Sequence, residues 1–294
     1  MAIPLSDAAV LAALRAEGVT VVEVGNWPKH NRSSKGLWGP VNGSMVHHSV
    51  TRGTASTVAL CRDGHSALPG PLCHGVIAKD GRVHLVGWGR TNHAGGGDPS
   101  VLAQVIAESY GTRPSPPTKG NSNGVDGNAR FYGWECENLG DGKDPWPAAQ
   151  YDAIVRVQAA LCRAHGWSAK SVIGHLEWSS DKIDPRGFGM PALRADVAER
   201  LTHPASWSPD DEAPESEEDT DMTPAQEALL KKIAGDVDKL KAKAAVDGWD
   251  YKNAALVAEA KKTGAKVPDM HGRIEQLQTT LDAVAAAVAE LKGV

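Results

Sequence analysis

The sequence lacks the features that would place it in a membrane or export it. No uninterrupted apolar run approaches the ~20 residues that a helix needs to span a bilayer. The first residues, MAIPLSD, carry no basic cluster, and Asp7, Arg15 and Glu17 interrupt any apolar core of a signal peptide. We therefore expect a chain that is made in the cytoplasm without a signal peptide and that does not insert into membranes.

Cysteine and phenylalanine are scarce. The four cysteines, Cys61, Cys73, Cys136 and Cys162, form no C-x-x-C pair, which argues against a structural zinc ribbon. A chain of 294 residues needs no disulfide framework, so buried free thiols are expected, although the disulfide state of Cys61 and Cys73 stays open. Only 2 phenylalanines stand against 9 tryptophans, so indole rings are expected to supply much of the aromatic core.

Excess negative charge is confined to one stretch. Residues 209–221 (PDDEAPESEEDTD) contain eight acids and no base, and without them 28 acids stand against 31 bases, a net charge of +3. Such a tract cannot bury a core and is typical of a solvated linker. We expect one domain over 1–203, a disordered acidic linker over 204–222 and a separate module over 223–294. No nucleic-acid partner is expected.

The first domain alternates strand and helix patterns. Capped or amphipathic stretches predict helices at 7–17, 54–63, 100–110, 148–165 and 191–201. Stretches rich in β-branched residues predict strands at 19–24, 44–50, 73–78, 83–87, 132–138 and 171–174. Gly81 suits the turn of a hairpin between two of these strands. The predicted fold class is α/β, with a mixed central sheet flanked by helices and one polar site at its edge.

The C-terminal module has an all-α pattern. Pro224 suits the first position of a helix. Apolar residues then recur at three- and four-residue spacing in two runs, which are Leu230, Ile233, Val237 and Leu240, then Ile274, Leu277, Leu281, Val284, Val288 and Leu291. This coiled-coil-like pattern fits a helical hairpin, a homo-oligomer formed through these helices, or a binding module. The sequence does not choose among the three.

Two segments, VHHS and GHLEWSSDKIDP, concentrate the side chains of a hydrolytic metal site. They carry His47, His48, His175, Lys182 and Asp184. Two histidines and one aspartate make the ligand number of a catalytic zinc site that keeps a fourth position for water. The working hypothesis from these residues is a zinc hydrolase.

Five short motifs follow one another along the first domain. They are VHHS at 46–49, CHGVIAKDG at 73–81, NHAG at 92–95, GWECE at 133–137 and GHLEWSSDKIDP at 174–185. In this order they resemble the N-acetylmuramoyl-L-alanine amidase family of zinc hydrolases (amidase type 2), which includes phage endolysins, muropeptide amidases and peptidoglycan recognition proteins. The resemblance covers about residues 40–202. It implies a mixed sheet flanked by helices, in agreement with the pattern of strands and helices.

The resemblance also implies a metal and its ligands. His47, His175 and Asp184 match the three ligands of Zn²⁺, the third of which is cysteine in many members and aspartate in others. An aspartate oxygen is an adequate zinc ligand. His48 is the alternative to His47, although adjacent strand residues face opposite sides of a sheet. Zn²⁺ is the only cofactor implied.

Further roles follow from the same resemblance. Lys182 matches the lysine that would stabilise the oxyanion, unless it is an ordinary surface lysine. Glu135 matches the carboxylate that would act as general base, and Glu137, two residues along the strand, is its competitor. His93 of the NHAG motif is expected on the substrate-facing rim. Cys73 stands where some relatives have a tyrosine, which increases the weight on Glu135.

The function implied is hydrolysis of the amide between N-acetylmuramic acid and L-alanine, with peptidoglycan as the partner. The linker and helical tail favour a phage endolysin that reaches the host cell wall through a holin pore. Two alternatives remain: a peptidoglycan-binding module that has lost catalysis, and a cytosolic muropeptide-recycling amidase. The sequence does not reveal the peptide-stem or host specificity.

Overall fold

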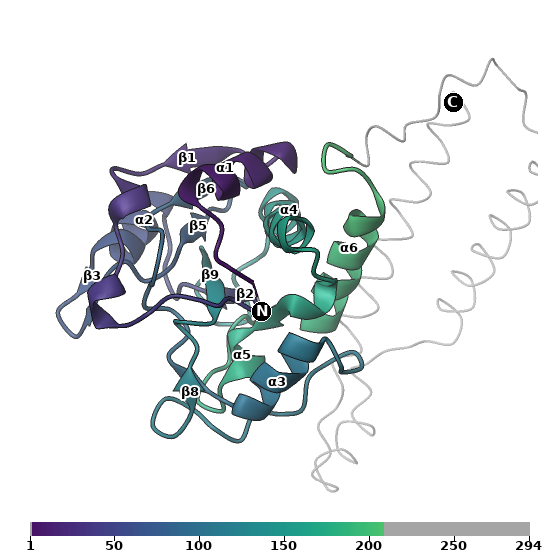
Figure 1. The fold of residues 1–294 in the computed structure, drawn as a ribbon. Coiled ribbons are helices and arrows are strands. Elements are labelled where there is room, and N and C mark those ends of the chain that lie inside the picture. Colours follow the sequence, from purple (N-terminus) through teal and green to yellow (C-terminus); the bar gives the residue numbers. More distant parts are fainter. Residues whose placement is uncertain (1, 209–294) are drawn as a thin grey trace, which may run out of the picture. The chain divides into compact units, whose positions relative to one another are not determined.

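A six-stranded mixed sheet organises residues 2–208, the part of the chain that the computed structural model describes (Figure 1). Its strands, in spatial order, are β1 (Val21–Glu23), β6 (Val83–Leu85), β5 (Gly75–Ile77), β9 (Phe131–Cys136), β2 (Gly43–His48) and β10 (Val172–Gly174). Only β5 and β6 pair antiparallel, and the other neighbours are parallel. The predicted α/β class with a mixed sheet is therefore confirmed. The linker from residue 209 onwards and the C-terminal helical module lie outside the described residues.

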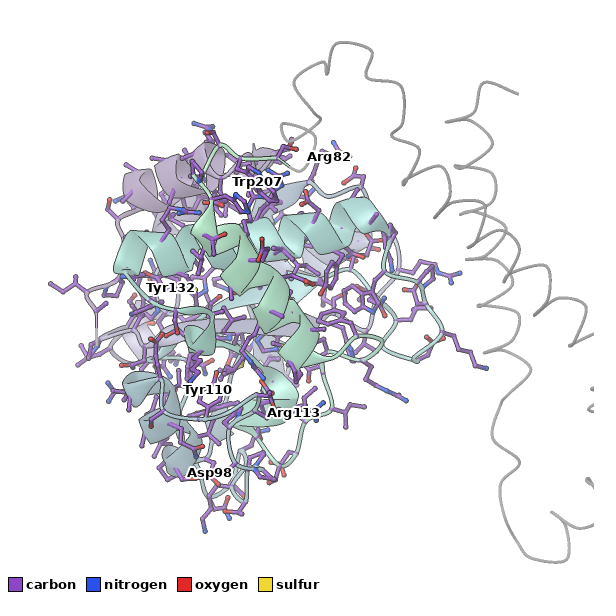
Figure 2. All side chains as sticks on the ribbon, turned by 90° about the vertical axis from the view of Figure 1, so that its right-hand side faces the viewer. Arg82, Asp98, Tyr110, Arg113, Tyr132 and Trp207 are labelled. Atoms are coloured by element: carbon purple, nitrogen blue, oxygen red, sulfur yellow. The ribbon has the colours of Figure 1, made fainter. Side chains whose placement is uncertain are left out.

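Helices cover both faces of this sheet. One face packs against α1 (Asp7–Ala16), α4 (Ala148–His165) and α6 (Met190–Thr202). The other face packs against α2 (Thr54–Asp63), α3 (Pro99–Ala107) and the single-turn α5 (His175–Trp178). Each face of the sheet has its own hydrophobic core. Figure 2 labels one aromatic side chain from each, Tyr132 from the core on the first face and Tyr110 from the core on the second. Because successive strand residues face opposite sides, Met45 joins the second core and Val46 the first.

Local sequence explains where the helices and the hairpin begin and end. Ser6 caps α1 by accepting a hydrogen bond from the backbone N–H of Ala9, 3.1 Å away. Gly166 ends α4 with a φ of 67°, a left-handed conformation that glycine adopts without a Cβ clash. Gly81 has a φ of 83° in the turn between β5 and β6, as the predicted hairpin requires.

The short elements escaped the sequence patterns. Neither α5 nor the two-stranded ribbons were expected; the ribbons are β3 (Gly64–His65) with β4 (Leu68–Pro69), and β7 (Gly96–Gly97) with β8 (Val125–Asp126). Three 3₁₀ turns were missed as well, η1 (Trp27–Lys29), η2 (Ser33–Lys35) and η3 (Ala169–Ser171). Elements of two to four residues contain too few positions to show a period of 2 or 3.6.

The N-terminal segment belongs to the same fold although it precedes the motifs. Glu17 is 1% exposed and forms ion pairs with Arg200 at 2.7 Å and Arg163 at 3.1 Å. The backbone of Leu5 bonds to the Tyr132 hydroxyl and to the Trp88 indole N–H, both at 2.8 Å. Residues 2–36 therefore complete the core.

The domain continues past residue 203, where the sequence suggested that the linker begins. Arg200 donates hydrogen bonds to the backbone carbonyls of Ala205 and Trp207. Within residues 2–208, no helix combines the length and the apolar character needed to cross a bilayer. All four cysteines are buried with free thiols.

Candidate metal centre

The carboxyl ends of three neighbouring parallel strands meet at one point. His47 is the penultimate residue of β2, Glu135 is its direct partner in β9, and His175 follows β10 as the first residue of α5. Two of these strands lie inside the sheet, so the site is at the strand ends rather than along an edge strand. Ligand sites at the carboxyl ends of parallel strands are typical of α/β folds.

Three side chains converge there. His47 Nδ1 lies 2.9 Å from His175 Nδ1 and 3.0 Å from Asp184 Oδ2, and His175 Nδ1 lies 3.2 Å from the same oxygen. All three residues are buried, and the three atoms form a group that could hold a metal ion. The structure thus brings together the three residues that the sequence proposed as zinc ligands.

The donor set fits a metal. The outer nitrogens of both rings are occupied, because His47 Nε2 faces His93 Nδ1 at 3.1 Å and His175 Nε2 lies 3.1 Å from the carbonyl oxygen of Ala94. When the outer nitrogens carry the hydrogens, the two Nδ1 lone pairs and the Asp184 carboxylate face one another. A cation satisfies this arrangement, and two imidazoles with one carboxylate are donors that zinc accepts.

Burial sets the charge of these groups. Burial, with His175 nearby, lowers the pKa of His47 to about 4, so its ring is neutral at pH 7, as a metal ligand must be. Burial alone would raise the pKa of Asp184, but the contacts with His175 and His47 more than offset this and hold the pKa below its usual range. The site therefore offers the negative charge of Asp184 and the neutral ring of His47.

Glu135 has the environment of a proton acceptor. Its Oε2 atom is buried without a hydrogen-bond partner. Burial, and secondarily the charge of Asp184, raise the pKa of Glu135 to about 8, while the charge of Lys182 opposes the shift. Lys182 is partly exposed and precedes Asp184 by two residues. A carboxyl group with a pKa near the working pH suits general acid–base chemistry.

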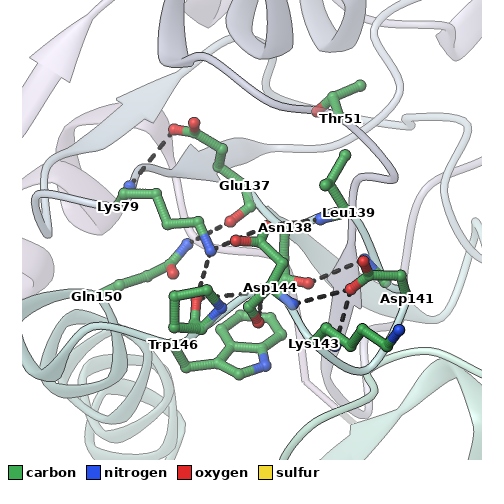
Figure 3. A network of polar contacts seen from close by, with 12 residues as sticks. Thr51, Lys79, Glu137, Asn138, Leu139, Asp141, Lys143, Asp144, Trp146 and Gln150 are labelled. Carbon is green, nitrogen blue, oxygen red and sulfur yellow. Dashed lines mark hydrogen bonds and ion pairs between the residues drawn. The ribbon is translucent and has the colours of Figure 1, made fainter.

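Glu137 has a different environment (Figure 3). Its carboxylate accepts hydrogen bonds from the Gly53 N–H at 2.8 Å, the Thr54 hydroxyl at 2.7 Å and the Lys79 N–H at 3.4 Å. Gly53 is the N-cap of α2, so the negative charge lies at the positive end of that helix. Both oxygens of Glu137 are thus engaged in structure, whereas Glu135 Oε2 has no hydrogen-bond partner.

His48 and His93 lie near the three-residue cluster but are not part of it. His48 accepts a hydrogen bond from the Arg186 N–H at 3.2 Å and is not part of the three-residue cluster. His93 is only 7% exposed and contacts the ring of His47, so it does not lie on an open rim as expected. Burial, then the neighbouring imidazole of His47, lowers the pKa of His93 well below its usual range.

A sequence comparison identifies the family. Residues 37–187 match the family model described as N-acetylmuramoyl-L-alanine amidase, which spans about half of the chain. The chain belongs to this family. No curated protein matches it.

Several solved structures are similar to this amidase-family chain. One is the endolysin N-acetylmuramoyl-L-alanine amidase LysCS from Clostridium intestinale URNW, with 17% identity, a TM-score of 0.36, and coverage of 60% of this chain and 95% of that one. Another is AmpDh3 from Pseudomonas aeruginosa, in complex with an anhydromuramic pentapeptide, with 15% identity, a TM-score of 0.39, and coverage of 59% and 66%. Drosophila peptidoglycan recognition protein SA shows 15% identity, a TM-score of 0.35, and coverage of 65% of this chain and 94% of that one.

Two further residues contact the site in positions that the sequence did not reveal. Ala94 contributes only its carbonyl oxygen, which lies against both His175 and the indole N–H of Trp178. Asn128 lies outside the five motifs, and its side-chain oxygen accepts hydrogen bonds from consecutive backbone N–H groups of the NHAG motif. A backbone carbonyl such as that of Ala94 leaves no signature in residue types, and the contacts of Asn128 join segments distant in sequence, so only the structure could find them.

Proposed function

We propose that this chain is a zinc-dependent amidase that hydrolyses the bond between the lactyl group of N-acetylmuramic acid and L-alanine in peptidoglycan. Family membership supports the reaction class. The observation that carries the proposal is the convergence of His47 Nδ1, His175 Nδ1 and Asp184 Oδ2 in one buried cluster. These three atoms would hold the zinc ion. When bound, zinc would supply Lewis acidity and would lower the pKa of water from 15.7 towards about 7.

Glu135 would act as the general base and then as the general acid. Its unpartnered Oε2 atom would accept a proton from the attacking water, whose oxygen forms a bond to the lactyl carbonyl carbon. The same carboxyl group would then return the proton to the nitrogen of L-alanine as the carbon–nitrogen bond breaks. One carboxyl group thus acts first as base and then as acid, and no other proton donor is needed.

Lys182 would stabilise the negative charge that develops on the carbonyl oxygen. It precedes Asp184 by two residues, and its charge already acts on Glu135 and His47. A fixed cation near a developing oxyanion lowers the barrier without reorganising at the moment of reaction.

We further propose that the enzyme is a phage endolysin that acts on the host cell wall. The amino-terminal catalytic domain is followed by the acidic stretch 209–221 and by the coiled-coil-like pattern over 223–294. In this proposal the protein is made in the cytoplasm and reaches peptidoglycan through a holin pore. The C-terminal segment would target the wall or join copies of the chain.

The decisive experiment measures new L-alanine amino groups released from purified peptidoglycan. Wild-type protein should release them, a chelator should abolish release, and added zinc should restore it. His47→Asn should be inactive, whereas His48→Asn, altered at the adjacent residue outside the cluster, should remain active. If folded, zinc-loaded wild type released no L-alanine, the enzyme proposal would be refuted, and the alternative function of a peptidoglycan-binding module would remain.

A further inference from the structure

The ring of His93 lies between a backbone carbonyl and a metal-site histidine. Its Nε2 atom lies 3.1 Å from the carbonyl oxygen of Phe131, and its Nδ1 atom lies 3.1 Å from His47 Nε2. A carbonyl oxygen can only accept, so His93 Nε2 carries the hydrogen of the neutral ring. His93 Nδ1 is then an acceptor, and His47 Nε2 must donate to it. This leaves the lone pair of His47 on Nδ1, the atom that faces His175 and Asp184.

The residue after His93 gives the same result for the second histidine. The carbonyl oxygen of Ala94 lies 3.1 Å from His175 Nε2 and accepts its hydrogen. The same oxygen accepts the indole N–H of Trp178 at 3.1 Å, so its direction is fixed from two sides. The lone pair of His175 is thereby on Nδ1. Two consecutive residues thus set the tautomers of both imidazoles.

A buried amide fixes this pair of residues in place. The Oδ1 atom of Asn128 accepts hydrogen bonds from the backbone N–H groups of His93 at 2.9 Å, Ala94 at 2.8 Å and Gly95 at 3.4 Å. Asn128 is 7% exposed, so these bonds are little weakened by competing water.

The sheet leaves room for the His93 ring at one glycine. A Cβ atom on Gly133 of β9 would come within 2.3 Å of the His93 ring. No side chain could be accommodated there without moving the imidazole. The glycine of the GWECE motif is therefore matched to the histidine of the NHAG motif.

We propose that His93 and Ala94, clamped by Asn128, form a positioning unit that fixes both zinc-binding histidines in the Nδ1-ligating tautomer. This inference rests on the proposed zinc function and assigns His93 a place behind the metal site instead of on the substrate rim. His93 is a positioning residue, since it acts through His47. Partners of this kind orient the rings of metal ligands, and their loss typically lowers metal affinity about 10- to 100-fold.

Two amide substitutions distinguish the contact of His93 with His47 from its contact with the Phe131 carbonyl. In His93→Asn, the side-chain oxygen can occupy the position of Nδ1 and accept from His47. In His93→Gln, the longer amide reaches the position of Nε2 and keeps only the contact with Phe131. His74→Gln is the matched control, because His74 is fully buried nearby and its ring nitrogens bond to the Gly133 N–H and the Gly89 carbonyl.

The readouts are zinc affinity, from competition with a chelator on the full chain, and the ¹⁵N chemical shifts of the His47 ring in zinc-loaded protein. We expect His93→Gln to weaken zinc binding about 10- to 100-fold and to lose the Nε2–H signature of His47. His93→Asn and His74→Gln should both bind zinc as wild type does. Equal losses in the Asn and Gln variants, or unchanged binding in the Gln variant, would overturn the inference. Because these readouts need no peptidoglycan, a wild type that binds zinc but releases no L-alanine would refute only the proposed function.

Discussion

Glu135 lies directly opposite His47 in the parallel pairing of β9 with β2. Residues paired across neighbouring strands point to the same face of a sheet, so the register places the proposed general base beside a proposed metal ligand. A shift of one residue would turn Glu135 to the face covered by α4. The register of two central strands thus determines whether the site can carry out chemistry.

Replacing Glu135 with glutamine should abolish most of the activity. Glutamine keeps the shape of the side chain but cannot take up and return a proton, and loss of a general base typically costs about 10²- to 10⁴-fold in rate. The measurement is kcat for L-alanine release, with zinc affinity measured in parallel. Zinc binding should stay unchanged. A Glu135→Gln enzyme with nearly wild-type kcat would transfer the role of base to another group.

The raised pKa of Glu135 predicts a pH dependence of stability in the metal-free protein. Because burial raises this pKa to about 8, the folded state binds the proton more tightly than the unfolded state does. The contribution to stability is complete below the unfolded pKa of about 4.3 and is lost as the pH rises towards 8. Denaturant titrations from pH 5 to 8 should show wild type losing stability relative to Glu135→Gln, by at most about 1.4 kcal/mol per pH unit. A constant difference between the two proteins would show that Glu135 is not buried as described.

Replacing Glu137 with glutamine should lower stability rather than catalysis. One carboxylate oxygen becomes an NH₂ group that faces a donor, either the Gly53 N–H or the Thr54 hydroxyl. An unsatisfied buried group of this kind costs about 1–3 kcal/mol in the free energy of unfolding. The check is denaturant unfolding, together with kcat per folded molecule. A large fall in kcat with unchanged stability would reverse the roles of Glu135 and Glu137.

Breaking the ion pair between Arg194 and Glu177 should weaken both the fold and the metal site. Arg194 is 6% exposed and Glu177 is 5% exposed, and two hydrogen bonds of 2.8 Å join their side chains. Glu177 follows the proposed metal ligand His175 by two residues. Arg194→Leu leaves a buried carboxylate without a charged partner, with only the Gly174 N–H at 3.2 Å still donating to it, and loss of one member of a buried ion pair typically costs about 3–5 kcal/mol. Thermal unfolding and zinc competition should both reveal the loss.

The control for this pair is the double variant. Adding Glu177→Leu to Arg194→Leu removes the unpaired charge and should recover part of the stability, because apolar pairs can replace buried ion pairs at little cost. If the double variant were less stable than Arg194→Leu, the unpaired carboxylate would not be the cause of the loss.

Much of the fold could be predicted because its long elements have clear periods and caps. The helices at 54–63 and 148–165 were predicted with the bounds that the structure shows. The hairpin was found from Gly81, whose positive φ only glycine adopts easily. The four-residue α5 was missed although it begins with His175, since one turn of helix contains no periodic signal.

The site was predictable in its residue types and less so in its geometry. Spacing and motif order brought out His47, His175 and Asp184, which the structure places together. The positions of His93 and Glu137 depend on what surrounds them, and these surroundings come from distant segments such as Gly53 and Phe131. No local pattern encodes which nitrogen of a ring meets a carbonyl group 38 residues away.

The buried contacts of Glu17 bear on how this catalytic domain could be transplanted. A fragment cut to the family-matched residues 37–187 would lose Glu17, the carboxylate that pairs with Arg163, along with the whole of α6. It would also leave β6 without its neighbour β1, and so open to pairing with a strand of another chain. A chimaera builder should therefore place the junction after Trp207 and keep the amino-terminal helix, because the piece that can be exchanged is larger than the piece that can be recognised.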